Sequence, residues 1–546
     1  MEGVMKRTFI FGNIHTMDPL HPTAEAIGIQ NGKIFYCGNR SAADLGPKDR
    51  ILDFHEQTIL PGFIDTHVHV IPSGIFMNSA NLSGADNIAE VLSCIRKHAE
   101  ETPKKGWVLA AFFQDKLIEE KRFPTRQELD AVSSEKPILI CHNDLHPIAL
   151  NSKALALLNV DPKKDGVRTD EAGRLTGIIE DPACVDMLGD ILAKLGIANI
   201  YDGIVRVDDY AVSHGVTTVF GKDVLDILTL IGITKDLLKA EYVPMWYSNG
   251  CKDLESIRKI AKNKRLAGRV CVCAFADGAF DGHSAATAEP YTDRPDTCGI
   301  LNYTDDEMYA FTAEAVKLGL QVSFHAIGDA AIDQVLRVYE RVLNDYPKED
   351  HRLRIEHFEE PTKEAIEKAG RLHVALGMQP LLIEVCERMD FSGYAPFIGD
   401  RVRRCSPYRS ILDAGILVGG GTDYTVTPME VLHGAQVLMT HPVESERISL
   451  QECLEMNTVN AAKLGFLENQ KGCLKPGMDA DFIVTDRDPY QVTTEELSDI
   501  RIMKTFRSGR KVYDRDAFLP TRKRSLAVVL MNVALKKVGS LFRIRN

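Results

Sequence analysis

The sequence lacks any apolar stretch as long as a membrane-spanning helix. Crossing a bilayer takes about 20 consecutive apolar residues, and no segment of the 546 residues approaches that length. The first ten residues, which include Lys6 and Arg7, also carry too short an apolar run for a secretory signal. We therefore expect a cytoplasmic protein.

The chain also lacks paired cysteines and an excess of positive charge. Its 12 cysteines form no Cys-X-X-Cys pair, and so few thiols in so long a chain predict reduced cysteines rather than a disulfide framework. The formal net charge is −12, which argues against nucleic acid as the main partner because phosphate binding relies on clustered Lys and Arg. A small-molecule substrate fits better.

Length and composition predict more than one domain. A chain of 546 residues exceeds the usual limit of a single hydrophobic core. Hydrophobic residues make up 45% and charged residues 26%, an ordinary globular composition that excludes disordered and fibrous classes. We expect one large domain of the size seen for (β/α)8 barrels and at least one smaller domain.

Strand-like and helix-like patterns alternate through the middle of the chain, as a parallel α/β architecture requires. Apolar runs predict strands at 107–113, 137–142, 217–220, 270–275, 321–325, 353–357, 374–379 and 416–420. Helical periodicity is clearest at 88–101, 305–318, 331–343 and 362–369.

The two ends of the chain are β-rich. Short strands are predicted at 8–14, 26–30, 33–38 and 51–60, with Asn31-Gly32 as a hairpin turn between two of them. These strands predict an antiparallel β domain before residue 61, or else part of a barrel edge. Strand-turn-strand patterns return at 475–486 and 501–513.

Residues 59–70, Ile-Leu-Pro-Gly-Phe-Ile-Asp-Thr-His-Val-His-Val, combine an apolar run with two histidines. Strand alternation places His67 and His69 on one face, roughly 7 Å apart, a distance that one metal ion spans. Asp65 is placed to orient one of the rings from behind. On its own, such a pair also fits two partly buried histidines that each make one hydrogen bond.

Two more histidines end strand-like runs, Val322-Ser-Phe-His325 and Leu353-Arg-Ile-Glu-His357. The carboxyl ends of strands are where (β/α)8 barrels build their active sites, so both histidines are candidate ligands. Gly419-Gly-Gly-Thr-Asp423 follows the last strand, and glycines there let the backbone approach a site closely. Asp423 is a candidate catalytic carboxylate, or alternatively a cap of the turn before Pro428.

The segment from Pro61 to His69, with His325-Ala-Ile-Gly-Asp329, resembles the signature of the amidohydrolase superfamily. It is most similar to amidohydrolase family 3, the branch that includes N-substituted formamide deformylases. The resemblance runs from about residue 13 to about residue 513. It implies a distorted (β/α)8 TIM barrel and a small β-sandwich built from both termini, whose C-terminal half is marked by Pro-Gly-Met-Asp-Ala-Asp at 476–481.

The resemblance also divides the chain. We assign 1–60 and 466–520 to the sandwich, and 61–465 to the barrel with an insertion at about 71–212. Residues 521–546 form a C-terminal helix in this division.

For chemistry, the resemblance implies metal ligation by His67, His69, His325 and His357. It makes Asp423 both a ligand and the aspartate that takes a proton from metal-activated water. A divalent metal lowers the pKa of water towards neutrality, and a nearby carboxylate accepts the proton and later delivers it to the leaving group. Histidine-rich ligation suits zinc, with iron or manganese possible.

One position departs from the family pattern. Many members carry a lysine four residues before the Asp-Gly of a Phe-X-Asp-Gly segment, where a carboxylated lysine bridges two metals. Here the segment is Phe275-Ala-Asp277-Gly278 and the position is Cys273, so we favour one ion over two. Glu180 matches a family glutamate and is a further candidate ligand. Cys273 is either a thiolate ligand or an inert core residue.

Four residues are candidates for substrate binding. In the resembled branch the insertion covers the barrel mouth, and His146 and Asn151 match positions that face substrate. The alternative is that both cap the helix that begins near residue 152. Asp277 and His283 lie on the loop after the strand at 270–275, and relatives commonly carry arginine where this chain has His283, which predicts an altered substrate preference.

The C-terminal segment 522–545 carries seven basic residues and no acidic one. Its apolar residues recur at helical spacing, at Leu526, Val529, Leu530, Val533 and Leu541. Such a helix lies on an anionic membrane surface or docks on this acidic protein or its twin subunit. We favour docking, and we expect a homodimer.

Together these patterns predict a metal-dependent amidohydrolase, an enzyme that hydrolyses a C–N bond other than a peptide bond in a small amide or N-formyl substrate. Two alternatives stay open. One is a deaminase of a cyclic amidine or nucleobase-like substrate, which uses much the same residues. The other is a relative that has lost activity and serves as a binding or assembly protein.

Overall fold

The computed structural model describes residues 7–103, 106–142, 147–180, 183–195, 197–223, 238–248, 250–263 and 270–517. By their internal contacts these residues divide into two compact units. The first comprises the described residues between 7 and 69 and between 208 and 517, and the second comprises those between 70 and 207. The predicted C-terminal helix lies outside the described residues. No helix in the described ranges is long and apolar enough to cross a membrane.

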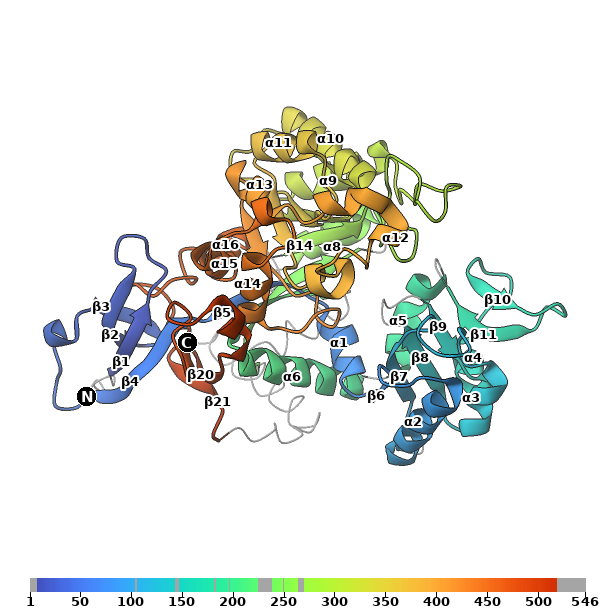
Figure 1. Cartoon of the computed structure of the whole chain (residues 1–546), viewed down its shortest axis with the longest axis horizontal. Coiled ribbons are helices and arrows are strands. Elements are labelled where there is room, and N and C mark those ends of the chain that lie inside the picture. The colour runs from blue at the N-terminus through green and yellow to red at the C-terminus, as the bar shows by residue number, and fades with distance from the viewer. Residues whose placement is uncertain are drawn as a thin grey trace, which may run out of the picture. The chain divides into compact units, whose positions relative to one another are not determined.

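Eight parallel strands form the central sheet of the first unit (Figure 1). In spatial order they are β5 (Phe63–Val68), β12 (Val216–Asp223), β13 (Glu241–Tyr247), β14 (Cys271–Phe275), β15 (Gln321–Ala326), β16 (Arg354–His357), β17 (Ala375–Met378) and β18 (Val418–Gly420). Helices follow successive strands: α8 (Leu254–Lys262), α9 (Asp305–Lys317), α10 (Asp329–Asp345), α11 (Lys363–Arg371) and α13 (Tyr408–Asp413). The predicted (β/α)8 barrel is confirmed.

The first and last strands meet, so the sheet is nearly closed. The backbone N–H of Asp423 donates to the carbonyl of His67 at 2.9 Å, and that of His69 donates to the carbonyl of Tyr424 at 3.1 Å. Beyond β18, the chain continues through α14 (Val431–Met439), α15 (Leu450–Met456) and α16 (Val459–Leu464). This closure brings the two ends of the barrel sequence together at the predicted ligands.

The inside of the barrel is apolar at the amino ends of the strands. Alternate residues of β12, β13 and β14 point inward. The cluster they form contains Ile64, Phe220, Val243, Met245, Cys271 and Cys273, packed against Ala461, Ala462 and Leu467 at α16. Polar side chains are therefore concentrated towards the carboxyl ends of the strands.

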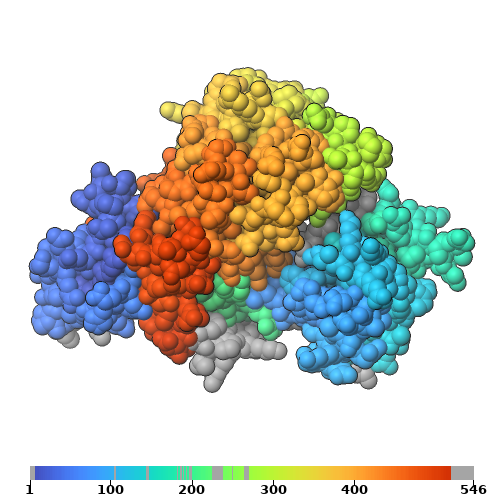
Figure 2. All heavy atoms as spheres, in the orientation of Figure 1, coloured from blue at the N-terminus to red at the C-terminus, as the bar shows by residue number. Residues whose placement is uncertain are grey.

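Strands from both termini form one mixed sheet, separate from the barrel sheet. Its order is β21 (Arg510–Asp514), β20 (Ile502–Arg507), β19 (Phe482–Thr485), β4 (Arg50–Pro61), β1 (Thr8–His15), β2 (Thr23–Gln30) and β3 (Lys33–Gly38). Figure 2 shows the surfaces of the two terminal segments, blue and red, next to each other. One apolar cluster contains residues of both segments.

The expectation of a purely antiparallel domain is wrong at one pair of strands. β1 and β4 are parallel, whereas the other neighbouring pairs of this sheet are antiparallel. β2 is antiparallel to β1 and β3 is antiparallel to β2, so β3 runs in the same direction as β1. Residues 39–49 then lead the chain back to the end of the sheet where β1 begins, and β4 runs parallel to β1 from there. The predicted hairpin turn is present, with positive φ angles of 56° at Asn31 and 79° at Gly32.

The second unit has its own sheet of six strands. Their order is β10 (Val167–Thr169), β11 (Leu175–Ile179), β9 (Ile148–Leu150), β8 (Ile138–His142), β7 (Val108–Phe113) and β6 (Ala80–Asn81). The helices α1 (Val70–Phe76), α2 (Ile88–Glu101), α3 (Arg126–Val132), α4 (Ser152–Leu158) and α5 (Ala183–Leu195) belong to this unit, and α6 (Ile197–Ser213) leads back into β12. Two of the predicted strands, β7 and β8, thus lie outside the barrel sheet.

Candidate metal centre

The predicted ligands gather at the carboxyl ends of barrel strands. His67 lies in β5, His325 in β15 and His357 at the end of β16, and Asp423 follows β18. The Oδ1 atom of Asp423 is 3.0 Å from His69 Nε2 and 3.4 Å from His67 Nε2. The ring of His357 has its centre 5.1 Å from that of His67 and 4.5 Å from that of His325.

This arrangement fits a divalent metal ion. His67, His357 and Asp423 each offer one ligand atom, and these atoms lie within 4.8 Å of one another. Among the buried atoms that form no hydrogen bond within the described ranges, four belong to the predicted ligands: His67 Nε2, His325 Nδ1, His357 Nδ1 and Asp423 Oδ1. Because buried polar atoms are normally paired, four unpaired donor atoms of the types that zinc prefers indicate a cation site.

Electrostatics at the centre keep the imidazoles available as ligands. Burial and then the positive charge of Lys222 lower the pKa of His67 and His325, and burial and the neighbouring His325 lower that of His357. Burial alone would raise the pKa of Asp423, but the adjacent imidazoles of His67 and His69 outweigh it and hold that pKa below its usual range. Neutral imidazole and ionised carboxylate are the protonation states that bind metals.

Glu356 positions His67, a role that the sequence analysis missed. Its Oε2 lies 2.8 Å from His67 Nδ1, which leaves Nε2 facing the centre. Arg354 binds the same carboxylate through two nitrogens, with Nε 2.6 Å from Oε1 and Nη2 2.8 Å from Oε2. Ser323 also donates a hydrogen bond to this carboxylate. Burial raises the pKa of Glu356, but Arg354 and His67 more than reverse this. The signal was present in Arg-Ile-Glu-His, where alternation sends Arg354 and Glu356 to the same side as the barrel interior.

Asp65 does not contact an imidazole ring in the way that the sequence analysis expected. Its carboxylate accepts the backbone N–H groups of His67 and Thr422, both at 3.1 Å, and the hydroxyl of Thr422 at 2.5 Å. Burial raises the pKa of Asp65 to about 7. Asp65 therefore fixes the backbone that carries His67 to the backbone that carries Asp423.

The predicted close approach of the glycine run is confirmed at Gly421. A Cβ atom there would lie 2.7 Å from the Cβ of His67 and 2.9 Å from its backbone nitrogen. Asp423 itself has a φ of 55° and His357 a φ of 72°. Such left-handed backbone at non-glycine residues is strained and clusters at functional sites.

Comparison with protein families shows which family the chain belongs to. The model of the amidohydrolase family matches residues 50–513. The chain belongs to the amidohydrolase family. Curated relatives include Protein LONG AFTER FAR-RED 3 of Arabidopsis thaliana, 26% identical, with 92% of this chain and 90% of that protein covered. Putative amidohydrolase YtcJ of Bacillus subtilis (strain 168) is also 26% identical, with 94% of this chain and all of that protein covered.

A third relative has a named activity. N-substituted formamide deformylase of Arthrobacter pascens is 26% identical, with 93% of this chain and 98% of that protein covered. Among solved structures, an uncharacterised metal-dependent hydrolase from Pyrococcus horikoshii OT3 matches with a TM-score of 0.76 and 24% identity, over 90% of this chain and 99% of that one. This structural match supports the amidohydrolase barrel.

Two predicted substrate-binding residues of this amidohydrolase lie on the loop after β14. Asp277 is buried and accepts backbone N–H groups of Ala286, Ile327 and Gly328. Its Oδ1 is 3.3 Å from His325 Nδ1, so it lies next to a predicted ligand. His283 lies 2.8 Å from Asp293 through Nε2 and packs against the Tyr291 ring.

Two predicted residues of the second unit, Glu180 and Asn151, make hydrogen bonds within that unit. Glu180 accepts a hydrogen bond from Arg168 at 2.6 Å. Asn151 is fully buried and caps α4, and it bonds the backbone at Ala154, Ile138, Ser133 and Lys136. Capping therefore accounts for its amide. His146 lies outside the described residues.

Cys273 lies in the apolar interior of the amidohydrolase barrel. Its side chain is fully buried in the cluster at the amino ends of the strands, and its Sγ is 3.9 Å from Cys271 Sγ. These surroundings favour an inert core thiol over a ligand.

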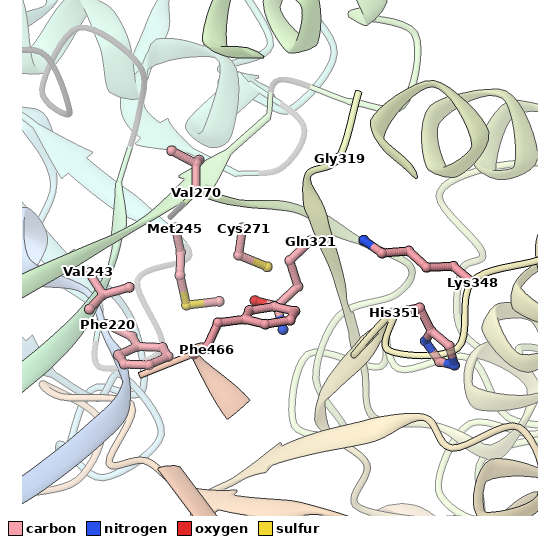
Figure 3. Close-up of a pocket in the computed structure, with 11 residues that line it drawn as sticks. Phe220, Val243, Met245, Val270, Cys271, Gly319, Gln321, Lys348, His351 and Phe466 are labelled. Carbon is pink, nitrogen blue, oxygen red and sulfur yellow. The ribbon is translucent and has the colours of Figure 1, made fainter. Parts of the chain in front are cut away.

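A pocket in the barrel lies at the amino ends of two strands. Figure 3 shows it between Phe220, Met245, Cys271 and Gln321, at the amino ends of β14 and β15, with Lys348 and His351 at one side. It contains none of the predicted ligands. Because (β/α)8 enzymes place chemistry at the other end of the strands, this pocket is not the candidate active site.

Proposed function

We propose that this protein hydrolyses a C–N bond, other than a peptide bond, in a small amide or N-formyl substrate. The observation that carries the proposal is the set of unpaired imidazole nitrogens arranged around Asp423 at the carboxyl ends of the strands. Membership of the amidohydrolase family supports the reaction class. The name of the Arthrobacter pascens deformylase, which this chain matches almost end to end, supports N-formyl compounds as the first substrates to test.

His67, His69, His325, His357 and Asp423 would hold the divalent ion. Nitrogen and oxygen donors suit zinc, and iron or manganese also fit. When bound, such an ion lowers the pKa of water towards neutrality and polarises a carbonyl group. Glu356 fixes one ring nitrogen of His67 and so presents the other to the centre.

Asp423 moves the proton in this proposal. Its carboxylate accepts a proton from the attacking water, and it then delivers that proton to the nitrogen that leaves. His69 Nε2 lies 3.0 Å from Oδ1 of this carboxylate, so a predicted ligand and the proton acceptor are neighbours. A single group thus serves as base and then as acid, which suits a reaction that consumes water and releases an amine.

Several finer points remain proposals. We propose one ion per chain, a homodimer and a cytoplasmic enzyme. Asp277 and His283 on the loop after β14, with His146 in the second unit, stay candidates for substrate contact, and Glu180 stays a candidate ligand.

The test combines a substrate panel with one conservative variant. Purified protein is incubated with N-substituted formamides, longer amides and purine or pyrimidine amidines, and formate, amine and ammonia are measured. The proposal predicts formate or another carboxylate together with amine, and loss of turnover in Asp423→Asn with metal content retained. Ammonia from the amidines alone would make the protein a deaminase, and turnover in Asp423→Asn would refute the role of that carboxylate.

A further inference from the structure

Lys222 is buried beside the metal centre without a hydrogen-bond partner. It lies near the end of β12 and is 3% exposed. Its Nζ makes no hydrogen bond within the described part of the chain. The Nζ atom is 4.6 Å from the centre of the Phe275 ring, and that ring stacks on His325 with 4.5 Å between centres.

The strand pattern explains why Lys222 points into the barrel. Phe220, two residues earlier, belongs to the apolar cluster inside the barrel. Alternation sends Lys222 to the same side, one step nearer the carboxyl ends of the strands. Gly221 pairs with Val68 of the neighbouring strand β5, which places Lys222 level with His69.

The described residues around Lys222 compensate little for its burial. Phe275 offers the ammonium a cation–π contact, but a ring face does not replace the hydrogen bonds that a buried ammonium loses from water. Glu356 does not replace them either, because Arg354 and His67 already engage its carboxylate.

The predicted ligands themselves bring little negative charge. Those among the barrel residues comprise imidazoles and one carboxylate, Asp423, whereas Glu356 is paired with Arg354 and Asp277 accepts backbone N–H groups. The charge of one divalent ion already exceeds the single negative charge of Asp423. A second ion would be repelled by the first ion and by the ammonium of Lys222, because little water is present to screen these charges.

We propose that Lys222 is the second cation of this centre. Its ammonium takes the electrostatic place of a second metal ion, limits the centre to one divalent ion, and donates a hydrogen bond to a carbonyl or carboxylate oxygen of the bound ligand. The identity of that ligand, an amide or the carboxylate released from it, rests on the proposed function. The limit on the metal count does not.

The first test is a zinc titration of the metal-free full-length protein by calorimetry. Wild type, Lys222→Met and Lys222→Arg are compared at about pH 8, where imidazoles of ordinary or lowered pKa are neutral. We expect one zinc per chain in wild type and Lys222→Arg. In Lys222→Met we expect the first zinc to bind at least roughly tenfold more tightly, or a second zinc to bind. Unchanged affinity and stoichiometry in Lys222→Met would overturn the proposal.

The second test concerns the oxygen ligand. Formate is titrated into the zinc-loaded proteins, and Lys222→Met is expected to bind it at least roughly tenfold more weakly than wild type, with Lys222→Arg close to wild type. Equal formate affinity in Lys222→Met and wild type would contradict the proposed hydrogen bond from Lys222 to the ligand.

A third measurement needs no variant and so is independent of whether Lys222→Met folds. The native mass of the wild-type protein is expected to show an unmodified chain with one metal ion. A chain heavier by one CO2, with two metal ions, would indicate a carboxylated lysine between two metals and overturn the proposal. None of these readouts requires turnover. If no amide is hydrolysed but Lys222→Met binds zinc more tightly, the proposed function fails and the role of Lys222 stands.

Discussion

The Oε2 atom of Glu356 lies 2.8 Å from Nδ1 of His67, although the two residues are 289 positions apart in the sequence. Arg354 holds the other side of this carboxylate, and all three side chains are fully buried. The pair fixes which nitrogen of His67 carries the proton, because the carboxylate accepts from Nδ1–H and leaves the Nε2 lone pair for a metal. The centre therefore depends on a carboxylate that is not itself a predicted ligand.

Glu356→Gln tests this dependence. The variant keeps the shape of the side chain but removes the charge that orients His67, so we expect metal affinity to fall by about 10- to 100-fold. It also leaves Arg354 buried without its counter-charge, at a cost of about 3–5 kcal/mol in the free energy of unfolding. Zinc titration measures the metal affinity and denaturant unfolding measures the stability. Glu364→Gln, at an exposed residue of α11, is the control for the same change in side chain. Wild-type affinity in Glu356→Gln would show that His67 needs no such support.

Gly421→Ala tests the closure of the barrel. The added Cβ would lie 2.7 Å from the Cβ of His67, so β5 and the segment after β18 must move apart. We expect a loss of about 1–3 kcal/mol in the free energy of unfolding and weaker metal binding. Gly84→Ala is the matched control, because its Cβ meets no atom within 4 Å. Equal effects of the two substitutions on metal affinity would contradict the close packing at His67.

Lys471 ties the barrel to the terminal sheet. Its buried ammonium lies 2.7 Å from Asp481, 2.8 Å from Glu241 in β13 and 3.2 Å from the Thr218 hydroxyl in β12. Lys471→Met removes the positive charge between two carboxylates, and we expect it to destabilise the protein by about 3–5 kcal/mol. Lys368→Met, at a partly exposed pair with Glu340, is expected to cost at most about 1 kcal/mol. Similar losses of stability in both variants would show that the burial of Lys471 does not set the size of the effect.

The same lysine sets a direction for pH dependence. Burial lowers the pKa of Lys471, but the charges of Asp481 and Glu241 outweigh it and raise that pKa above its ordinary value. A folded-state pKa above the unfolded one gives stability that is complete below the unfolded value and is lost as pH rises through the folded value. The difference between wild type and Lys471→Met should therefore hold steady near neutrality and shrink only above about pH 10. A difference that disappears between neutrality and about pH 9 would contradict this assignment.

Metal removal should lower thermal stability through the histidine cluster. A ligand that binds only the folded state at about 100 times its Kd adds about 2.7 kcal/mol. Zinc added to chelator-treated protein should therefore raise the Tm, and His357→Ala should abolish the rise. The same rise in that variant would place the stabilising metal elsewhere in the molecule.

The clustering of the predicted ligands could be predicted from the sequence because each histidine ends a strand-like run. His325 and His357 follow apolar alternation, and a (β/α)8 barrel brings such strand ends together. The hairpin at Asn31-Gly32 was equally predictable, since its turn chemistry is local. The strand β13 was not predicted, because it contains Pro244. Proline lacks the backbone N–H that a central strand donates to its neighbour, so a proline argues against such a strand.

The residues that support the ligands were not predictable in the same way. Glu356 and Lys222 are charged residues inside strands. The alternation of Arg354 with Glu356 is a local signal that both point inward, but the contact of Glu356 with His67, 289 positions away, and the position of Lys222 beside Phe275 depend on how the strands are arranged. Asp65 was noticed, but its position two residues before His67 did not reveal that it bonds the backbone at Thr422. The parallel pairing of β1 with β4 also depended on a connection whose path local sequence does not specify.

The most direct test is the metal content of the purified protein, measured by plasma mass spectrometry for wild type and His67→Ala. The account predicts about one zinc, iron or manganese ion per wild-type chain, because the donor set holds one ion, and loss of that ion in His67→Ala with the fold retained. A protein that binds no metal even after reconstitution, or one whose metal content is unchanged in His67→Ala, would contradict the central claim that these histidines form a hydrolytic metal centre.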